Sequence, residues 1–331
     1  EKLWQLFFVT PEALTGVNTA TRAGETTKDA LEKMPVGGII YFAKNLEDTD
    51  QTSEMLKNTQ SYVKIPLFLG VDEEGGRVAR VSSNEDMGVD PIDAMGTFGE
   101  SGDIASLYNA VSGLAAGIHA LGLNFDFAPV ADVSSGKNSV IGDRSFGTDA
   151  SLCASMVSVA ASALTDSGVV PCLKHFPGYG SASADDHNGP AEVTKTLEEL
   201  EQCDLVPFVS GIEKGAPFIM VSHLSVPALT GGDMPCDLSY EAVTETLRNK
   251  MGFAGVIITD AQNMASITSR YDAGEAAVQA LKAGVDMILM PDDLQAAYDA
   301  VSSAVGSGSL SAQRIDESVL RILQVKAKYG L

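Results

Sequence analysis

The segment from Lys174 to Pro190, KHFPGYGSASADDHNGP, places three titratable side chains close together: Asp185, Asp186 and His187. Its proline and glycine residues disfavour a helix, and its length is typical of functional loops rather than minimal connections. A carboxylate near a histidine can orient the imidazole and keep it protonated, which suits proton delivery to a leaving group. The alternative is a solvated acidic turn that carries an incidental histidine.

Asp260 directly follows the apolar run GVIIT, so its carboxylate is expected at the end of a strand. A carboxylate there can act as a nucleophile, a base or a hydrogen-bond acceptor. The competing interpretation is a helix N-cap, a common role for Asp. Lys174 and His175 also stand at a strand end, where a structural role is equally open. His119 lies in helical sequence and is interpreted as structural, and His223 is left undecided.

A metal site at the same loop is the other chemical possibility, since one histidine and two aspartates could ligate a cation. Ligands at three adjacent positions would be strained, and no second histidine has the spacing of a zinc-binding helix. The sequence therefore predicts no metal and indicates no cofactor.

The cysteines are scattered and have no CxxC spacing of a metal knuckle or redox pair. Cys172 lies in an apolar run and is expected to be a buried thiol. A disulfide between Cys203 and Cys236 remains open.

Short apolar runs bounded by turn residues alternate with longer stretches of helical spacing, the pattern of repeated βα units. The eight runs are Gln5 to Val9, Gly38 to Phe42, Pro66 to Val71, Asn124 to Pro129, Pro171 to His175, Phe218 to Ser222, Gly255 to Thr259, and Asp286 to Met290. The expected helices include Ile104 to Leu121, Ala150 to Asp166, Thr196 to Ile212, Tyr240 to Lys250, Ala273 to Ala283, and Leu294 to Val305. In a last helix after the possible N-cap Ser311, the apolar face would hold Ile315, Val319, Ile322 and Leu323.

Eight such units without a linker or a change in composition predict an α/β fold, a single (β/α)8 TIM barrel over residues 1–331. A doubly wound sheet is the alternative, but it would need a glycine-rich turn after the first strand. The segment LFFVTPEALTG has no G-x-G-x-x-G.

In a TIM barrel the active site lies at the carboxyl ends of the strands. Polar groups follow most of the runs here, in VDEEGGRVAR, FAPVADV with IGDRSFG, KHFPGYG, MVSHLSVPAL, ITDAQNM and LMPDD. Five or six strand ends therefore converge on one mouth.

The net charge of −22 and the pI near 4.4 exclude classes of partner. Nucleic acids and anionic lipids bind clustered Lys and Arg, and an acidic surface repels both. No uninterrupted apolar stretch has the length of a membrane span. The chain begins at Glu1 rather than Met, which leaves a removed leader open and favours a secreted or envelope location over a cytoplasmic one.

Together these motifs resemble glycoside hydrolase family 3, specifically its NagZ-type β-N-acetylglucosaminidases. DEEGGRV resembles the family's D-x-E-G-G-R-V signature, FAPVADV and GDRSFG its fourth-strand motifs, KHFPGYG with DDH its catalytic loop, and ITDAQNM its nucleophile segment. The order of five motifs on eight βα units makes the resemblance specific, and it covers nearly the whole chain.

The resemblance implies a role for each matching residue. Asp260 matches the nucleophile, His187 the histidine acid/base, and Asp185 its dyad partner. The loop of about residues 176–190 would be the catalytic loop. Residues matching those that hydrogen-bond the sugar in the −1 subsite are Asp72, Arg80, Arg144, Lys174 and His175. Such bonds strengthen as the sugar ring distorts toward the oxocarbenium-like state.

Two positions depart from the family's pattern. Asp186 stands where the family commonly has Ser, and a second carboxylate there would favour the protonated imidazole. Tyr179 stands where many relatives have His. Both leave the proposed chemical groups intact but could change the pH optimum or the preference for the leaving group.

The resemblance implies a retaining exo-β-N-acetylglucosaminidase that acts on peptidoglycan fragments or related oligosaccharides. A neutral imidazole would not repel an anion, so phosphorolysis is a variant. A β-glucosidase or β-xylosidase is a rival, although in those relatives a further domain typically supplies the acid. The chain ends with the expected last barrel helix, so the proton donor is expected in the barrel. A non-catalytic sugar-binding barrel is the alternative from another class. The sequence indicates neither the natural aglycone nor the oligomeric state.

Overall fold

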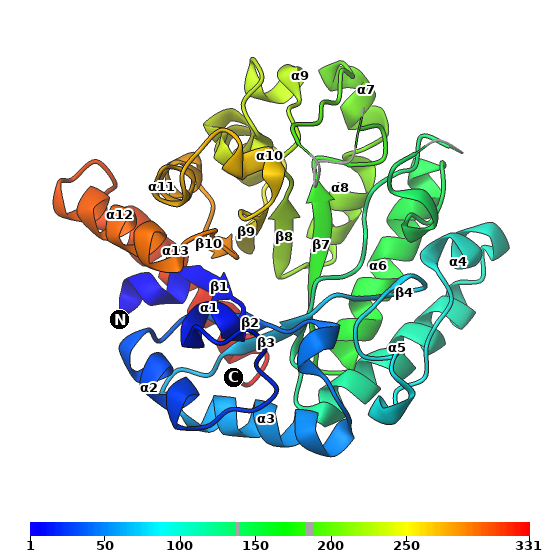
Figure 1. Cartoon of the computed structure of the whole chain (residues 1–331). Coiled ribbons are helices and arrows are strands. Elements are labelled where there is room, and N and C mark those ends of the chain that lie inside the picture. The colour runs from blue at the N-terminus through cyan, green and yellow to red at the C-terminus, as the bar shows by residue number, and fades with distance from the viewer. Residues whose placement is uncertain (137–138, 183, 185–188) are drawn as a thin grey trace.

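The chain folds into a closed barrel in the computed structural model, which describes residues 1–136, 139–182, 184 and 189–331 (Figure 1). Within these residues, eight parallel strands close in the order β1-β10-β9-β8-β7-β6-β3-β2. The barrel strands are β1 (Phe7–Val9), β2 (Gly38–Ile40), β3 (Phe68–Val71), β6 (Phe125–Asp126), β7 (Val170–Phe176), β8 (Phe218–Val221), β9 (Val256–Ala261) and β10 (Met287–Leu289). Each lies in or overlaps one of the eight predicted runs, which confirms the (β/α)8 barrel.

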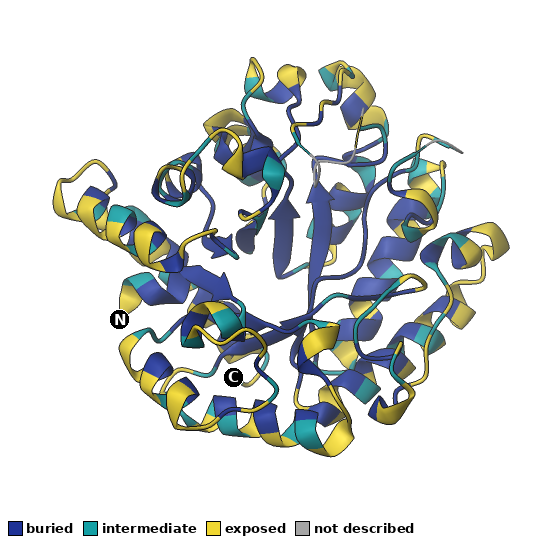
Figure 2. Cartoon of the chain, in the orientation of Figure 1, coloured by how far each residue is buried: buried dark blue, intermediate teal, exposed yellow. Residues whose placement is uncertain are grey.

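Helices surround the barrel and cover its outer face (Figures 1 and 2). The α-helices are α1 (Pro11–Thr15), α2 (Glu25–Lys33), α3 (Thr49–Ser61), α4 (Met95–Ser101), α5 (Ile104–Leu121), α6 (Ala150–Asp166), α7 (Leu197–Gln202), α8 (Val206–Glu213), α9 (Pro227–Thr230), α10 (Ala265–Thr268), α11 (Ala273–Ala283), α12 (Leu294–Gly306) and α13 (Ala312–Lys328). Short 3-10 helices are η1 (Lys2–Leu6), η2 (Ala43–Asn45), η3 (Glu85–Met87), η4 (Gly142–Arg144) and η6 (Cys236–Leu238), and η7 (Glu241–Lys250) is a π-helix.

Strand pairing excludes the doubly wound alternative. Phe8 of β1 pairs with Gly38 of β2 on one side and with Leu289 of β10 on the other. The first and last strands are therefore neighbours, which closes the sheet and removes its edges.

Phenylalanine rings fill the barrel beneath the carboxyl ends of the strands. The rings of Phe8, Phe68, Phe125 and Phe218 are fully buried, and they pack with centroid separations of 4.8 to 6.4 Å. Gly70 makes room for this cluster, since a Cβ there would lie 2.9 Å from the Phe8 ring. The packed rings form a rigid floor under the strand ends.

Asp286, just before β10, is the centre of a buried charge network at the opposite end of the barrel. Its carboxylate accepts hydrogen bonds from Arg248 Nη2 at 2.6 Å, Arg321 Nη1 at 3.0 Å, Ser318 Oγ at 2.6 Å and Ile257 N at 3.0 Å. The network joins η7, β9 and α13. The fully buried carboxylate of Asp286 thus holds cations and donors from three elements around one anion.

We expect Asp286→Ala to lower the free energy of unfolding by about 3–5 kcal/mol, because several hydrogen bonds from half-buried arginines to one buried carboxylate are lost at once. Urea unfolding measures this loss. The control is Asp316→Ala, which breaks an exposed pair with Lys2 and should cost about 0–1 kcal/mol. Equal losses in the two variants would contradict the assigned role of the network.

The single helix predicted from Thr196 to Ile212 is wrong, because the structure has two helices, α7 and α8, in this segment. Thr196 caps α7 in a reciprocal capping box with Glu199, but α7 ends at Gln202 and α8 starts at Val206. Pro207 stands in the first turn of α8, where its missing N–H costs nothing. The helical spacing of apolar residues continues through the break between α7 and α8, so this spacing alone does not indicate that the helix is interrupted.

The last helix is confirmed, with one error on its apolar face. Ser311 caps α13 by accepting a hydrogen bond from Arg314 N, and Ile315 and Ile322 are buried. Leu323 is 36% exposed and does not belong to the buried face. The helix instead buries Lys326, whose Nζ lies 5.1 Å from the centre of the Phe68 ring.

All four cysteines lie in described parts of the chain and are free thiols. Cys172 is buried as predicted, and the Cys203–Cys236 disulfide that the sequence left open is absent.

Among the described helices, α5 alone is long and apolar enough to cross a membrane by length and composition. It packs against α6 in the ring around the barrel and buries residues that include Leu107, Leu114 and Ile118. A core helix passes the same test, so this is weak evidence of a span.

Candidate active site

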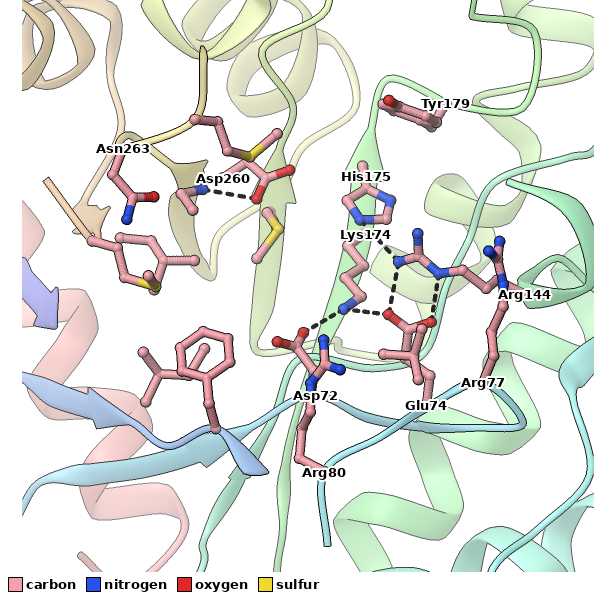
Figure 3. Close-up of a pocket in the computed structure, with 18 of the residues that line it drawn as sticks. Asp72, Glu74, Arg77, Arg80, Arg144, Lys174, His175, Tyr179, Asp260 and Asn263 are labelled. Atoms are coloured by element: carbon pink, nitrogen blue, oxygen red, sulfur yellow. Dashed lines mark hydrogen bonds and ion pairs between the residues drawn. The ribbon is translucent and has the colours of Figure 1, made fainter. Parts of the chain in front are cut away.

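A cavity of about 460 Å³ opens at the carboxyl ends of the barrel strands (Figure 3). Its lining includes six of the eight residues predicted for the site: Asp72, Arg80, Arg144, Lys174, His175 and Asp260. The other two, Asp185 and His187, lie outside the described residues together with Asp186. The barrel thus brings residues that are up to 188 positions apart in sequence, from Asp72 to Asp260, into one cavity at the ends of its strands.

A short hairpin after β3, formed by β4 (Glu73–Gly75) and β5 (Val78–Ala79), carries one wall of the cavity. Glu74 and Arg80 line the cavity, whereas Glu73 is not among the lining residues. Glu73 closes the hairpin, because its carboxylate accepts hydrogen bonds from the backbone N–H groups of Arg80 and Val81, both at 2.7 Å. The alternating direction of side chains in an extended strand separates these two neighbouring glutamates by role.

Lys174 is the hub of the charge network in this wall (Figure 3). Its buried ammonium lies 2.7 Å from Asp72 Oδ1 and 2.6 Å from Glu74 Oε1. Arg144 binds the same glutamate with both Nε and Nη2, at 2.7 and 2.8 Å. Burial alone would raise the pKa of Glu74, but the charges of Lys174 and Arg144 outweigh it and bring that pKa to about 2.

His175 is fixed by Asp132, a fully buried residue after β6. The imidazole Nδ1 lies 2.7 Å from Asp132 Oδ2, and Asp132 Oδ1 accepts hydrogen bonds from the backbone N–H groups of His175 and Tyr179, at 3.1 and 2.7 Å. The opposite ring nitrogen, Nε2, lies 3.5 Å from Arg144 Nη2. A carboxylate that holds one nitrogen sets the orientation of the ring toward the cavity.

Asp260 lies in β9, one residue before the strand ends, so the interpretation as a helix N-cap is wrong. The following helix, α10, has Met264 at its N-cap. The carboxylate accepts a hydrogen bond from the adjacent Ala261 N at 2.7 Å. Burial would raise its pKa, but the charges of His175 and His223 and the Ala261 N–H lower it below the ordinary value. Asp260 is therefore an anion at neutral pH, as a carboxylate nucleophile must be.

His223, which the sequence left undecided, is buried behind Asp260. Its Nε2 lies 2.9 Å from the Ala261 carbonyl oxygen, and its Nδ1 lies 3.1 Å from Asp237 Oδ2. His119, by contrast, is exposed on α5 and is not among the residues that line the cavity.

Asp204 connects the two flanks of the predicted catalytic loop. Its buried carboxylate pairs with Lys195 on the far flank and accepts a hydrogen bond from Ser181 Oγ at 3.4 Å on the near flank. Gly178 packs directly on this residue, since a Cβ at Gly178 would lie 2.7 Å from the Asp204 Cβ. Asp204 stands in the break between α7 and α8.

Several lining residues were not predicted as site residues, and among them Glu74, Arg77 and Asn263 carry a charged or amide side chain. Glu74 and Arg77 stand in VDEEGGRVAR, and their position after the third run was the available signal. Asn263 follows Asp260 by three residues, and its backbone N–H donates to the carbonyl of Met290 at 3.0 Å. Met290 has a φ of 46°, rare for a residue with a Cβ, and its N–H is bound to Phe8 O at 2.8 Å.

The cavity combines the half-buried carboxylate of Asp260 with cations and hydrogen-bond donors in a confined space. Lys174 and Arg144 are ordered before any ligand arrives, because Glu74 holds both. Arg80 Nε is buried and has no hydrogen-bond partner within the described chain, so it can donate to a ligand. Such an arrangement suits a small polyhydroxylated molecule whose reacting carbon lies against Asp260.

A closed (β/α)8 barrel with a polar cavity at the carboxyl ends of its strands is the architecture of TIM-barrel enzymes. Comparison with known sequences gives the family. The model of the "Glycosyl hydrolase family 3 N terminal domain" matches residues 1–325, and the chain therefore belongs to glycosyl hydrolase family 3.

Curated relatives are beta-hexosaminidases. The chain is 31% identical over 339 residues to beta-hexosaminidase A of Pseudoalteromonas piscicida. The aligned region covers 93% of this chain and 56% of that protein. The chain is 36% identical over 303 residues to beta-hexosaminidase LpqI of Mycobacterium tuberculosis, covering 88% of this chain and 76% of that protein. The chain thus spans little more than half of the first relative.

Solved structures show the same fold. A glycoside hydrolase family 3 beta-N-acetylglucosaminidase from Paenibacillus superposes with a TM-score of 0.92 at 34% identity, over 99% of this chain and 62% of that one. A family member from Mycobacterium smegmatis superposes with a TM-score of 0.86 at 32% identity, over 98% of this chain and 96% of that one.

Proposed function

We propose that this protein is a retaining exo-β-N-acetylglucosaminidase that removes non-reducing terminal N-acetylglucosamine from peptidoglycan fragments or related oligosaccharides. The observation that carries the proposal is the half-buried, anionic Asp260 in a cavity that is also lined by Lys174, Arg144, Asp72 and Arg80. The relatives named as beta-hexosaminidases and beta-N-acetylglucosaminidases support the choice of sugar.

In the first step, a carboxylate oxygen of Asp260 attacks the anomeric carbon and the bond from that carbon to the leaving oxygen breaks. His187, assisted by Asp185, gives its proton to the leaving oxygen. In the second step, His187 takes a proton from water, which displaces Asp260 from the anomeric carbon. Two displacements retain the β configuration.

The charged wall would bind the sugar in the first subsite, with Asp72, Arg80, Arg144, Lys174 and His175 bonding to its hydroxyl groups. The ring must flatten as positive charge develops at the anomeric carbon. Hydrogen bonds from the protein that reach their best length only when the sugar ring is distorted stabilise the transition state more than the bound substrate. The rigid network around Glu74 supplies this preorganisation, because it does not have to form during the reaction.

The test is release of p-nitrophenol from its N-acetyl-β-glucosaminide, compared with the β-glucoside and the β-xyloside. We expect turnover of the N-acetyl-β-glucosaminide. Preference for either of the other two would favour a β-glucosidase or β-xylosidase, and no turnover of any of them would favour a non-catalytic sugar-binding barrel. Running the assay with and without inorganic phosphate and identifying the sugar product distinguishes hydrolysis from phosphorolysis.

We expect His187→Ala to lower kcat/KM by about 10²–10⁴-fold for leaving groups that need a proton, because the general acid is lost. The loss should be much smaller for a 2,4-dinitrophenyl leaving group, which departs as a stable anion. His119→Ala is the control and should behave as wild type, because His119 is exposed on α5 outside the cavity. Equal losses for both leaving groups would contradict the acid/base role.

A further inference from the structure

We infer that His223 and Asp237 form a positioning pair, in which Asp237 holds the imidazole and the imidazole fixes the peptide that carries Asp260. The inference rests on the proposed function, because it assigns the pair to the nucleophile of that reaction. Neither residue lines the cavity, so the pair would act through Asp260 and not by touching substrate.

The contacts form a continuous path to the nucleophile. Asp237 Oδ2 lies 3.1 Å from His223 Nδ1, and His223 Nε2 lies 2.9 Å from the carbonyl oxygen of Ala261. The N–H of the same Ala261 donates to Asp260 Oδ1 at 2.7 Å. The imidazole therefore holds the residue whose N–H holds the nucleophile.

The backbone around the pair is equally well anchored. Asp237 N donates to Ser222 O at 3.3 Å, and Cys236 N donates to Leu224 O at 2.9 Å, so η6 is attached to the segment that follows β8. Ser222 N in turn donates to Phe176 O at the end of β7. The pair thus links three neighbouring strand ends, and both side chains are fully buried.

The proton count favours a definite arrangement. The Ala261 carbonyl can only accept, so His223 Nε2 carries a proton. The other ring nitrogen, Nδ1, faces Asp237 Oδ2 at 3.1 Å. If neither atom carried a proton, two hydrogen-bond acceptors would face each other. A proton on Nδ1 would relieve this repulsion, and the ring would then be an imidazolium paired with Asp237 and adjacent to the residue that holds Asp260.

The charged groups around Asp260 come from two neighbouring strand ends. Lys174 and His175 face it from β7, and His223 faces it from the segment after β8. Burial raises the pKa of Asp237, the charge of His223 lowers it, and the charge of Asp260 raises it. Loss of His223 should therefore raise the pKa of Asp260, because one of the positive charges that favour its ionised form disappears.

The test compares His223→Phe, which keeps a ring but has no donor, with His223→Gln, which keeps a donor for the Ala261 carbonyl. The substrate is the 2,4-dinitrophenyl N-acetyl-β-glucosaminide, so that the acid/base residue contributes little. We expect His223→Phe to lower kcat by about 10–100-fold, the usual range for a residue that orients a functional group, with KM changed by less than about threefold. His223→Gln should recover part of the rate.

The pH profile separates positioning from a merely structural role. In both variants the acid limb of kcat/KM should move to higher pH, because Asp260 becomes harder to ionise. Asp237→Asn, whose amide can still hold Nδ1, should lose less rate than Asp237→Ala. A wild-type rate and a wild-type acid limb in His223→Phe would overturn the inference, as would a loss that follows thermal stability alone.

Asp260→Ala, assayed in parallel, keeps failure of the inference apart from failure of the proposed function. If Asp260→Ala remains active, the proposed nucleophile is wrong and the inference falls with it. If Asp260→Ala is inactive while His223→Phe and Asp237→Ala match wild type, the proposed function stands and only the positioning pair is refuted.

Discussion

Replacing Asp260 by Ala is expected to lower kcat by on the order of 10⁴-fold or more, because the covalent route through the glycosyl-enzyme is lost. The fold should be unaffected, since within the described part of the chain the Asp260 side chain accepts a hydrogen bond only from the adjacent Ala261 N. The measurement is single-turnover hydrolysis of an activated N-acetyl-β-glucosaminide, with circular dichroism and thermal unfolding to verify the fold.

Azide makes this prediction sharper. A small anion can enter the space left by the missing carboxylate and attack the anomeric carbon from the same face, which gives a product of α configuration. We expect azide to restore part of the rate of Asp260→Ala and to form the α-glycosyl azide. Asp292→Ala is the control: this exposed aspartate also follows a strand, but it does not line the cavity. A β-glycosyl azide, or full activity without azide, would contradict the assignment.

Replacing Lys174 by Met is expected to have the second large effect, on stability as well as activity. The change removes the partner of two carboxylates, Asp72 and Glu74, and we expect a loss of about 3–5 kcal/mol in the free energy of unfolding. Lys250→Met is the matched control, since Lys250 forms an exposed pair with Glu201 and its loss should cost about 0–1 kcal/mol. Equal effects would contradict the network.

The pH dependence of stability provides a second measurement on the same network. The pKa of Glu74 is lowered from 4.5 to about 2, so its ionised form stabilises the fold fully above the ordinary value. That contribution should be lost progressively as the pH falls from 4.5 toward 2. Urea unfolding across this range should show a shallower decline in Lys174→Met than in wild type. Parallel profiles would indicate that Lys174 does not lower the pKa of Glu74.

The sequence predicted the barrel because its determinants are local. A strand buried on both faces appears as an apolar run, and the helices α5, α6 and α11 begin after the aspartate caps Asp103, Asp149 and Asp272. The sequence-based predictions of helices were wrong where tertiary contacts outweigh the helical spacing of apolar residues. The break between α7 and α8 surrounds the buried Asp204, and α13 buries Lys326 in place of Leu323.

The sequence predicted six of the residues that line the cavity, but it did not predict how they pair. Asp260 follows an apolar run and Lys174 lies near the end of one, and these positions place both residues at the mouth of the barrel. By contrast, Lys174 meets Asp72 across 102 positions of sequence, and no local pattern announces such a contact. The pairs His175–Asp132 and His223–Asp237 are hidden for the same reason, because each joins the ends of different segments.

The central claim is that Asp260 forms a covalent bond to N-acetylglucosamine, and peptide mapping of a trapped intermediate tests it most directly. A 5-fluoro N-acetylglucosaminyl fluoride slows the second step and accumulates the glycosyl-enzyme, which is then digested and sequenced by tandem mass spectrometry. We predict one added sugar on the peptide that contains ITDAQNM, located at Asp260. A sugar on any other residue, or rapid turnover with no adduct at all, would contradict the account.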